Sequence, residues 1–372
     1  MPTAVTIEGL LGGMKTHNAS DLHLKTGLPP TYRIGGHLRA LNLPAMSGDD
    51  IERCMSTIIP PKRRDFYEEY GDLDFAAELP DGDRFRVNIF RAANRMNAAI
   101  RRVKGEIATY ETLHLPSIYH DLIGKTHEGL IIVSGVTGSG KSSTLAAMIE
   151  HINESRSENI VTIEDPIEYL FRPVKSIVSQ REIGIDIPSY GEGLKYVVRQ
   201  DPDVIFIGEM RDKFTMSAAL QAAETGHLVF GSLHTADAMQ AFARILEFFP
   251  RNEHEFIRAS LSNSLRAICA QRLLPGCRED APLVPATEVL LNSPTCRDLI
   301  RKEQDEDIPE LIASSSNEGM RSFTASLADL VEAELVFRDT AMKFAPNADA
   351  LASTLRGIKT QAQSMIHRVR AS

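Results

Sequence analysis

A lysine and a serine follow a glycine-rich turn near the middle of this sequence. Residues 135–142 read GVTGSGKS, which is the spacing Gly-x4-Gly-Lys-Ser. Glycines at these positions let successive backbone N–H groups turn inward around a phosphate, and the start of a following helix adds partial positive charge. Lys141 is then placed to reach β- and γ-phosphates, and the Ser142 hydroxyl to hold Mg²⁺. The spacing predicts a nucleoside triphosphate site, with a chance Gly/Ser turn as the alternative.

The segments on either side of this turn have the character that a phosphate loop requires. An apolar run at 130–133 predicts a buried strand before it, and an Ala/Leu/Met-rich run at 144–152 predicts a helix after it. Strand, glycine-rich turn and helix in this order argue against a chance turn. We therefore expect nine consecutive residues to line the nucleotide: Gly135, Val136, Thr137, Gly138, Ser139, Gly140, Lys141, Ser142 and Ser143.

Two further apolar strands end in carboxylates. The stretch NIVTIE ends at Glu164, which Asp165 follows, and the stretch DVIFIGE ends at Glu209. Ligands of open α/β sheets lie at the carboxyl ends of the strands, so these acids are candidates for the metal or for the attacking water. Gly208 stands where many such strands carry a magnesium-binding Asp, which makes Glu209 the better candidate for the water. For Glu164, a simple acidic turn before Pro166 has equal weight.

Two histidines flank the next apolar strand. His227 precedes the run LVFGSL, and His234 follows it. Their spacing along a strand does not suit one metal site, and a lone histidine is more often structural than catalytic. His234 nevertheless ends a strand that comes next in order after the Glu209 strand. We expect it at the same sheet edge, as a sensor of the γ-phosphate.

A basic stretch lies well before the phosphate loop. Between residues 84 and 104 there is no acidic residue, and there are seven basic ones: Arg84, Arg86, Arg91, Arg95, Arg101, Arg102 and Lys104. On the strand that starts at Arg84, arginines and Asn88 share one face and apolar side chains share the other. The stretch is a charged, solvated edge strand, a nucleic-acid stripe, or a surface that meets phosphates, including those bound by a neighbouring subunit.

Composition limits the class of protein. The chain has 372 residues, 43% of them apolar and 24% charged, with a net charge of −9. This fits a soluble globular protein of two or three domains and argues against a general nucleic-acid binder. None of the four cysteines forms a C-x-x-C pair, and their low number fits a reducing cytoplasm. No signal peptide is predicted, and no apolar run approaches the ~20 residues that span a bilayer.

The order of strand-like and helix-like segments suggests the domain organisation. Residues 1–105 are predicted to form a small α+β domain, and residues 106–128 a linker. From residue 129 to residue 372, strands and helices alternate at first, which argues for an α/β fold with a mostly parallel sheet.

Helices are predicted to dominate the end of the chain. We expect helices at 239–249 and 253–272, one more strand at 288–291, and helices from there onward. The last stretch, 349–370, is Ala/Leu-rich and mildly basic, and either docks on a partner or covers the domain.

Five blocks of the sequence, taken together, resemble one family. They are ASDLHL at 19–24, the phosphate loop, VTIEDPIEYL at 161–170, QDPDVIFIGEMRD at 200–212 and AAETGHLVFGSLHT at 222–235. In this order they are similar to the secretion ATPases, and most of all to the type IV pilus retraction motors. SLRAICAQRLL at 264–274 and GMRSFTASLADL at 319–330 also match runs of that family.

The resemblance implies a fold and a site. The fold is a RecA-like P-loop NTPase motor domain with a smaller α+β PAS-like N-terminal domain. The ligands are ATP and Mg²⁺, and hydrolysis drives pilus retraction and twitching motility. The family's motif positions fall on Glu164, Glu209, His227 and His234. Arg86 and Arg101 stand where family members contact nucleotide phosphates, which favours the phosphate interpretation of the basic stretch.

The resemblance also implies partners and a location. We expect a homo-hexamer that acts on an inner-membrane pilus platform protein, with a paralogous motor ATPase as a further candidate partner and no nucleic acid. The expected location is the cytoplasm, peripheral at the inner membrane.

Some features depart from the family. The retraction run AIRNLIRE is replaced by TCRDLIRK at 295–302, and Val136 replaces the usual Pro or Ala. The four-cysteine insertion of assembly and secretion relatives is missing, which favours retraction. The alternatives are a pilus-assembly or type II secretion ATPase, an accessory ATP-binding subunit of another motor, and a nucleic-acid motor of RecA-like fold.

Overall fold

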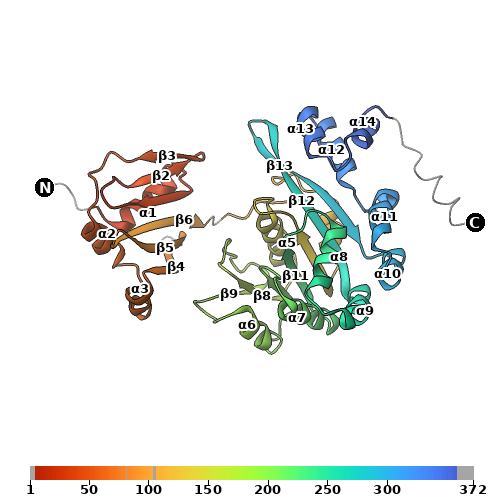
Figure 1. Ribbon diagram of the computed structural model, residues 1–372, viewed down its shortest axis with the longest axis horizontal. Coiled ribbons are helices and arrows are strands. Elements are labelled where there is room, and N and C mark those ends of the chain that lie inside the picture. Colours follow the sequence, from red (N-terminus) through yellow and green to blue (C-terminus); the bar gives the residue numbers. More distant parts are fainter. Residues whose placement is uncertain (1–4, 81, 104–105, 358–372) are drawn as a thin grey trace, which may run out of the picture. The chain divides into compact units, whose positions relative to one another are not determined.

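The computed structural model describes residues 5–80, 82–103 and 106–357, in which the chain forms two compact units (Figure 1). One unit runs to Glu106 and also includes Glu168–Leu170; the other holds the remaining residues from Ile107 onward. Lys104 of the basic stretch and most of the predicted C-terminal stretch, 358–370, lie outside the described residues.

The first unit is built on a six-stranded antiparallel sheet with strand order β3-β2-β1-β6-β5-β4. Its strands are β1 (Asp21–Leu24), β2 (Thr31–Ile34), β3 (His37–Ala40), β4 (Asp72–Glu78), β5 (Arg84–Ala92) and β6 (Arg95–Val103). Its helices are α1 (Ile7–Thr16), α2 (Gly48–Met55) and α3 (Arg64–Tyr70), with the 3-10 turn η1 (Pro61–Arg63) before α3.

Alternation along β5 determines which face of this sheet is buried. Phe85, Val87 and Ile89 are fully buried and join a core that includes Ile7 and Ile51 of the helices. The intervening arginines lie on the opposite, more polar face, as the sequence predicts. The sheet therefore presents a row of cations on the face that its helices do not cover.

The second unit contains a seven-stranded sheet with strand order β13-β12-β7-β11-β10-β8-β9. Its strands are β7 (Gly129–Ser134), β8 (Asn159–Glu164), β9 (Ile177–Glu182), β10 (Val204–Ile207), β11 (Leu228–Leu233), β12 (Leu265–Arg278) and β13 (Ala281–Leu291). All neighbouring pairs from β12 to β9 are parallel, and β13 is antiparallel to β12. This is the predicted α/β fold.

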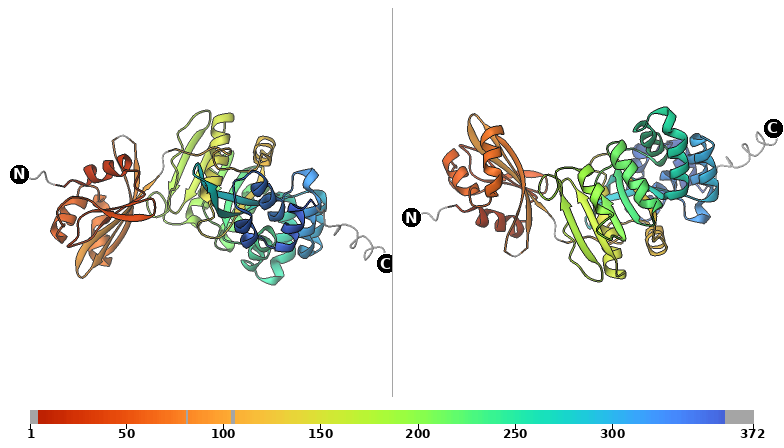
Figure 2. Two further views of the ribbon diagram at one scale, coloured as in Figure 1. Left: turned by 90° about the horizontal axis from the view of Figure 1, so that it is seen from above. Right: turned by 90° about the horizontal axis from the view of Figure 1, so that it is seen from below.

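Helices pack around this sheet, and the last of them gather at one end of the unit (Figure 2). The α-helices are α4 (Ile118–Lys125), α5 (Lys141–Ser155), α6 (Tyr190–Val197), α7 (Lys213–Glu224), α8 (Ala238–Glu247), α9 (His254–Ser264), α10 (Pro294–Arg301), α11 (Ile308–Ser314), α12 (Phe323–Glu332), α13 (Arg338–Phe344) and α14 (Ala348–Leu355). The 3-10 turns are η2 (Arg251–Glu253), η3 (Asp305–Asp307) and η4 (Ser316–Glu318).

Two apolar clusters hold these layers together. Ile132 and Ile205 of the central strands pack with Met216 of α7 in one of them. In the other, Leu274 of β12 packs with Leu327 of α12. No helix in the described part of the chain combines the length and the apolar character that crossing a bilayer requires.

The predicted helix at 253–272 is wrong beyond Ser264. Residues 265–270 belong to β12, between β7 and β13, where apolar side chains are buried on both faces of the sheet. Such a strand has no polar alternation, so a short apolar run does not distinguish it from a buried helix. The strand predicted at 288–291 is only the end of β13, because Pro282 and Pro285 mask its beginning.

Candidate nucleotide-binding site

Parallel strands bring the predicted site residues of the second unit to one sheet edge. β7 leads directly into the phosphate loop, and its neighbour β11 ends immediately before His234. β10 leads to Glu209, and β8 ends at Glu164. Because the carboxyl ends of parallel strands meet at the same edge, side chains from four separate segments converge there.

The phosphate loop has glycines at positions where the backbone φ angle or the lack of space for a Cβ atom disfavours other residues. Gly140 has φ 87° and caps the start of α5. At Gly135, where φ is 158°, a Cβ atom would come within 2.6 Å of the Gln271 carbonyl oxygen. Lys141 is 8% exposed, and its ammonium donates to the carbonyls of Gly135 (2.7 Å) and Val136 (3.3 Å).

Buried hydroxyl groups surround this loop. The oxygens of Ser134, Ser139 and Thr235 are buried and have no hydrogen-bond partner among the residues that the structure describes. Buried polar atoms are nearly always paired, so unpaired groups at a sheet edge favour a polar ligand or ordered water there.

Glu209 is held by two neighbours. Arg211 Nε donates to its Oε2 at 2.9 Å, and His234 Nε2 lies 3.4 Å from its Oε1. Arg211 also lies 3.4 Å from Asp165 Oδ2 and therefore links the ends of β10 and β8. The structure places His234 at the sheet edge where the sequence predicts it, next to Glu209. The motif contained Arg211, but its spacing alone did not indicate this link.

Burial lowers the pKa of His234, and the positive charge of Lys141 lowers it further, against the opposing effect of Glu209. The imidazole is therefore neutral near pH 7. The dependence on Lys141 also places the histidine within electrostatic reach of the phosphate loop.

Glu164 is a buried carboxylate at the end of β8, 5% exposed. It accepts hydrogen bonds from Thr162 Oγ1 at 2.6 Å and from Gln180 Nε2 at 3.1 Å. The neighbouring Gly208 is tightly enclosed: a Cβ atom there would lie 3.0 Å from the Tyr190 hydroxyl and 3.3 Å from Glu164 Cα. This crowding is a physical reason for glycine where related strands carry an aspartate.

Gln271 is a site residue that sequence reasoning missed. It lies on β12 next to the phosphate loop, 1% exposed, and donates from Nε2 to the Ser139 carbonyl at 2.6 Å. A hollow of about 220 Å³ adjoins it, between the loop and β12. The run CAQRLL at 269–274 matches the family, but a helix predicted there does not indicate which of its residues faces the loop.

His227 does not join this site. It precedes β11, and its carbonyl accepts from Gly129 N at the start of β7. A strand rises about 3.3 Å per residue, so His227 lies roughly 20 Å from His234, at the opposite edge of the sheet. Its ring Nδ1 is 2.9 Å from the Ala222 carbonyl at the end of α7.

The two predicted phosphate-contacting arginines are direct cross-strand neighbours in the first unit. Arg86 on β5 pairs in register with Arg101 on β6. Arg101 Nε donates to Asp21 Oδ1 at 2.8 Å, and Arg33 Nε lies 3.6 Å from the other oxygen. The row Arg33, Asp21, Arg101 and Arg86 holds three arginines and one aspartate, so it carries an excess of positive charge. Like charges placed directly opposite each other, such as Arg86 and Arg101, are destabilising.

Asp21 anchors that row. Burial raises the pKa of its carboxyl, but hydrogen bonds from Ser20 and Arg101 outweigh burial, and the net pKa is lowered. The carboxylate is therefore charged at neutral pH and restrains Arg101.

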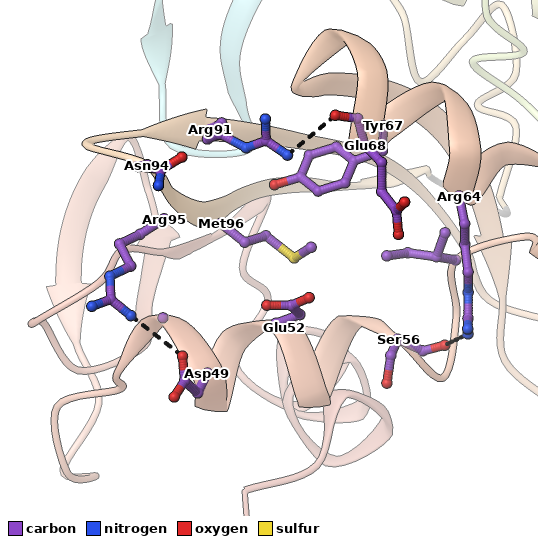
Figure 3. Close-up of a pocket in the computed structure, with 12 residues that line it drawn as sticks. Asp49, Glu52, Ser56, Arg64, Tyr67, Glu68, Arg91, Asn94, Arg95 and Met96 are labelled. Atoms are coloured by element: carbon purple, nitrogen blue, oxygen red, sulfur yellow. Dashed lines mark hydrogen bonds and ion pairs between the residues drawn. The ribbon is translucent and has the colours of Figure 1, made fainter.

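The first unit also has a hollow of about 420 Å³ between α2, α3 and the β5–β6 hairpin (Figure 3). Three arginines and three acids line it: Arg64, Arg91, Arg95, Asp49, Glu52 and Glu68. The charges balance, Arg95 is paired with Asp49 at 3.3 Å, and no glycine-rich loop is present among its lining residues. It therefore lacks the excess of donors that a phosphate site requires.

Comparison with known proteins shows which family this chain resembles. The family described as type II/IV secretion system protein matches residues 5–359. The chain is 38% identical to the type IV pilus retraction ATPase PilT of Pseudomonas aeruginosa over 335 residues, which are 90% of this chain and 96% of the relative. It is also 38% identical to the type IV pilus ATPase PilU of the same organism, over 92% of this chain and 90% of the relative.

A solved structure extends the comparison to the fold. The pilus retraction motor PilT with bound ADP superimposes with a TM-score of 0.86 at 39% identity, over 93% of this chain and 98% of the other. The RecA-like P-loop motor fold that the sequence predicts is thereby confirmed. The chain belongs to the type II/IV secretion system protein family, and within that family it is an ATPase of the pilus retraction kind.

Proposed function

We propose that this chain is the motor of a pilus retraction machine, and that the carboxyl edge of the second unit's sheet is its catalytic centre. The observation that carries the proposal is the convergence of Lys141, Glu209 and His234 at that edge. It occurs in a chain that resembles a pilus retraction ATPase over nine-tenths of its length. The two units would be the PAS-like and RecA-like domains of that motor.

Lys141 and the loop N–H groups would bind the β- and γ-phosphates of ATP. The Lys141 ammonium donates to the neutral carbonyls of Gly135 and Val136. Charged phosphate oxygens are stronger acceptors, so ATP would displace those carbonyls.

The residues present fit Mg²⁺. The ion prefers hard oxygen donors and is usually held by one or two protein ligands together with phosphates and water. Ser142 supplies a hydroxyl, and Glu164 and Glu209 lie at the same edge as candidate carboxylate ligands, directly or through water. In the described part of the chain, no group of three or more His, Cys, Asp or Glu could hold an ion alone, in keeping with a site completed by the substrate. When bound, Mg²⁺ would neutralise charge on the phosphate oxygens.

Glu209 is the proposed residue that orients the attacking water. The water oxygen would bond to the γ-phosphorus as the bond to the β,γ-bridging oxygen breaks, and the water's proton would pass to the Glu209 carboxylate. Arg211 and His234 hold the two oxygens of that carboxylate in place. A neutral His234 can also hydrogen-bond the γ-phosphate and report its presence.

Arg86 and Arg101 would neutralise charge that develops on the γ-phosphoryl group. Their cross-strand placement leaves an excess of positive charge, which an anion would relieve. We propose that they act on nucleotide bound in a homo-hexamer, where closing around ATP and opening after hydrolysis would move the two units as on a hinge. The ring would work on an inner-membrane platform protein, from the cytoplasmic side, with or without a paralogous motor.

Glu209→Gln tests the chemistry. We expect Mg²⁺-dependent ATPase activity to fall by about 10²- to 10⁴-fold, because the amide cannot accept the proton. Glu255→Gln, the same change at an exposed position on α9, should leave activity within twofold. Unchanged turnover in Glu209→Gln would favour an accessory ATP-binding role. In cells, deletion should block retraction while pili persist, and loss of pili would instead favour an assembly ATPase.

Mixing two inactive variants tests whether the arginines act between subunits. Arg86→Ala removes the arginine that would contact the γ-phosphate but keeps the phosphate-loop lysine. Lys141→Ala removes that lysine but keeps the arginine. If Arg86 acts on a neighbour's nucleotide, rings that contain both variants hold some intact sites and regain part of the activity. If it acts within its own chain, no mixture recovers. Arg39→Ala, at an exposed position on β3, is the control.

A further inference from the structure

Gln271 occupies an unusual place for a polar side chain. On β12, Cys269 and Ala270 pair in register with Val133 and Ser134 at the end of β7. The next residue of β12, Gln271, therefore lies beside the first residue of the phosphate loop, Gly135. Its side chain is buried, as are those of the four apolar residues, 267–270, that precede it on β12.

The amide of Gln271 joins two parts of the nucleotide-binding segment. Its Nε2 donates to the Ser139 carbonyl at 2.6 Å, and its Oε1 accepts from Thr144 Oγ1 at 2.8 Å. A carbonyl oxygen can only accept, so the NH₂ group must face Ser139 and the orientation of the amide is unambiguous. One side chain thus connects Ser139 of the phosphate loop to Thr144 in the first turn of α5.

This arrangement affects the group that would meet a phosphate. In a trans peptide, the C=O and the N–H point in opposite directions. Because Gln271 holds the Ser139 carbonyl on the β12 side, the Gly140 N–H of the same peptide is turned away from β12. A hydrogen bond to the carbonyl also polarises the peptide and makes its N–H a better donor.

We propose that Gln271 is a positioning residue for nucleotide binding, which holds the Ser139–Gly140 peptide so that its N–H faces the phosphates. The inference rests on the proposed function to the extent that nucleotide occupies this loop. Burying an amide costs free energy that an apolar residue of β12 would avoid. Both side-chain hydrogen bonds of Gln271 go to the phosphate loop and α5, and neither goes to another strand of the sheet. The buried amide therefore supports the nucleotide-binding segment and not the pairing of strands.

Gln271→Glu tests the donor role because it can be switched by pH. An ionised carboxylate cannot donate to Ser139, but a protonated one can, and burial raises the pKa of a carboxyl. We expect the Kd for ADP, relative to wild type at the same pH, to rise by at least about tenfold at pH 8, which corresponds to ~1.4 kcal/mol. The ratio should fall toward one at pH 6. Gln271→Met has no hydrogen-bond donor in its side chain, so it should bind ADP weakly at both pH values.

Calorimetric titration with ADP gives the Kd values, and melting without nucleotide reports the fold. Gln221→Glu, the same change at an exposed position on α7, should bind as wild type does. A Gln271→Glu ratio that does not change with pH, or normal binding with a lowered melting temperature, would overturn the proposal. Should Gln271→Glu fail to fold, Thr144→Val frees the amide at one end and should weaken binding by a few-fold.

These outcomes separate the inference from the proposed function. A folded wild-type chain that does not bind ADP would contradict the proposed function. Wild-type binding with unaltered affinity in the Gln271 and Thr144 variants would contradict only the role of Gln271.

Discussion

The phosphate-loop edge of the second unit and the arginine row of the first unit satisfy their charges differently. In the second unit, Lys141 is 8% exposed and bound to loop carbonyls, and Glu164 is buried between two donors. In the first unit, Arg101 is 69% exposed and bound to Asp21. The Arg86 side chain is exposed, with no hydrogen bond or ion pair to any residue that the structure describes.

This difference indicates which region is complete in itself. A buried charge is tolerated only when its neighbours satisfy it, so the phosphate-loop edge is pre-organised by its own fold. Two exposed like charges on paired strands repel each other, although water and salt screen the repulsion, and an anion bound between them would relieve it. We infer that one region forms the site and that the other contributes only when a phosphate is brought to it.

Removing the lysine should have the largest effect. We expect Lys141→Ala to lower ATPase activity by at least about 100-fold, because a preorganised cation at the developing charge is lost. Lys213→Ala on α7, which removes a lysine paired with Glu253 at 2.6 Å, should change activity less than twofold. Steady-state assays on both variants check this. Comparable losses of activity in the two variants would contradict the inference that the phosphate-loop edge forms the site.

Changing Asp21 to Asn should have an intermediate effect, because it frees Arg101 without removing it. We expect turnover to fall by several-fold and the unfolding free energy to fall by about 1.5–3 kcal/mol, the usual value of a hydrogen bond to a charged group. The folded-state pKa is below the ordinary 3.8, so Asp21 stabilises the fold above that pH, and this contribution is lost as the pH falls through the folded pKa. Urea unfolding between pH 3 and pH 7 should show that loss in wild type only.

The pH dependence of His234 should have a smaller effect. Its pKa is lowered from 6.5, so the neutral form prevails at pH 7, and the stability it contributes is lost as the pH falls below 6.5 through the folded pKa. Protonation would also bind Glu209 more tightly and withdraw it from water. ATPase activity in wild type should therefore fall as the pH drops below 6.5 and His234 becomes protonated. His234→Gln should flatten this acid limb, and an unchanged limb would assign it to another group.

The smallest effect is expected in the hollow of the first unit. Arg95→Ala removes an exposed pair with Asp49, and exposed pairs are worth about 0–1 kcal/mol. ATPase activity should stay within twofold of wild type. A large loss would show that the arginine row is not the only cationic surface of the first unit that matters.

Sequence alone was sufficient for the features that depend on local spacing. The glycine-rich loop with Lys141 could be read directly, because a strand, a turn and a helix lie together in the chain. The carboxyl-end positions of Glu164, Glu209 and His234 followed from the rule that parallel strands share an edge. The alternation that exposes Arg86 follows from the two-residue repeat of a strand.

The tertiary structure decided what depends on register between distant segments. Gln271 and Ser139 are 132 residues apart, and only the pairing of β12 with β7 brings them together. The row Arg33, Asp21, Arg101 and Arg86 likewise follows from the pairing of four strands, and it accounts for the excess charge. His227 shares a motif with His234 but lies at the opposite edge, because β11 separates the two. Such relations depend on strand pairing over long loops, which local spacing does not encode.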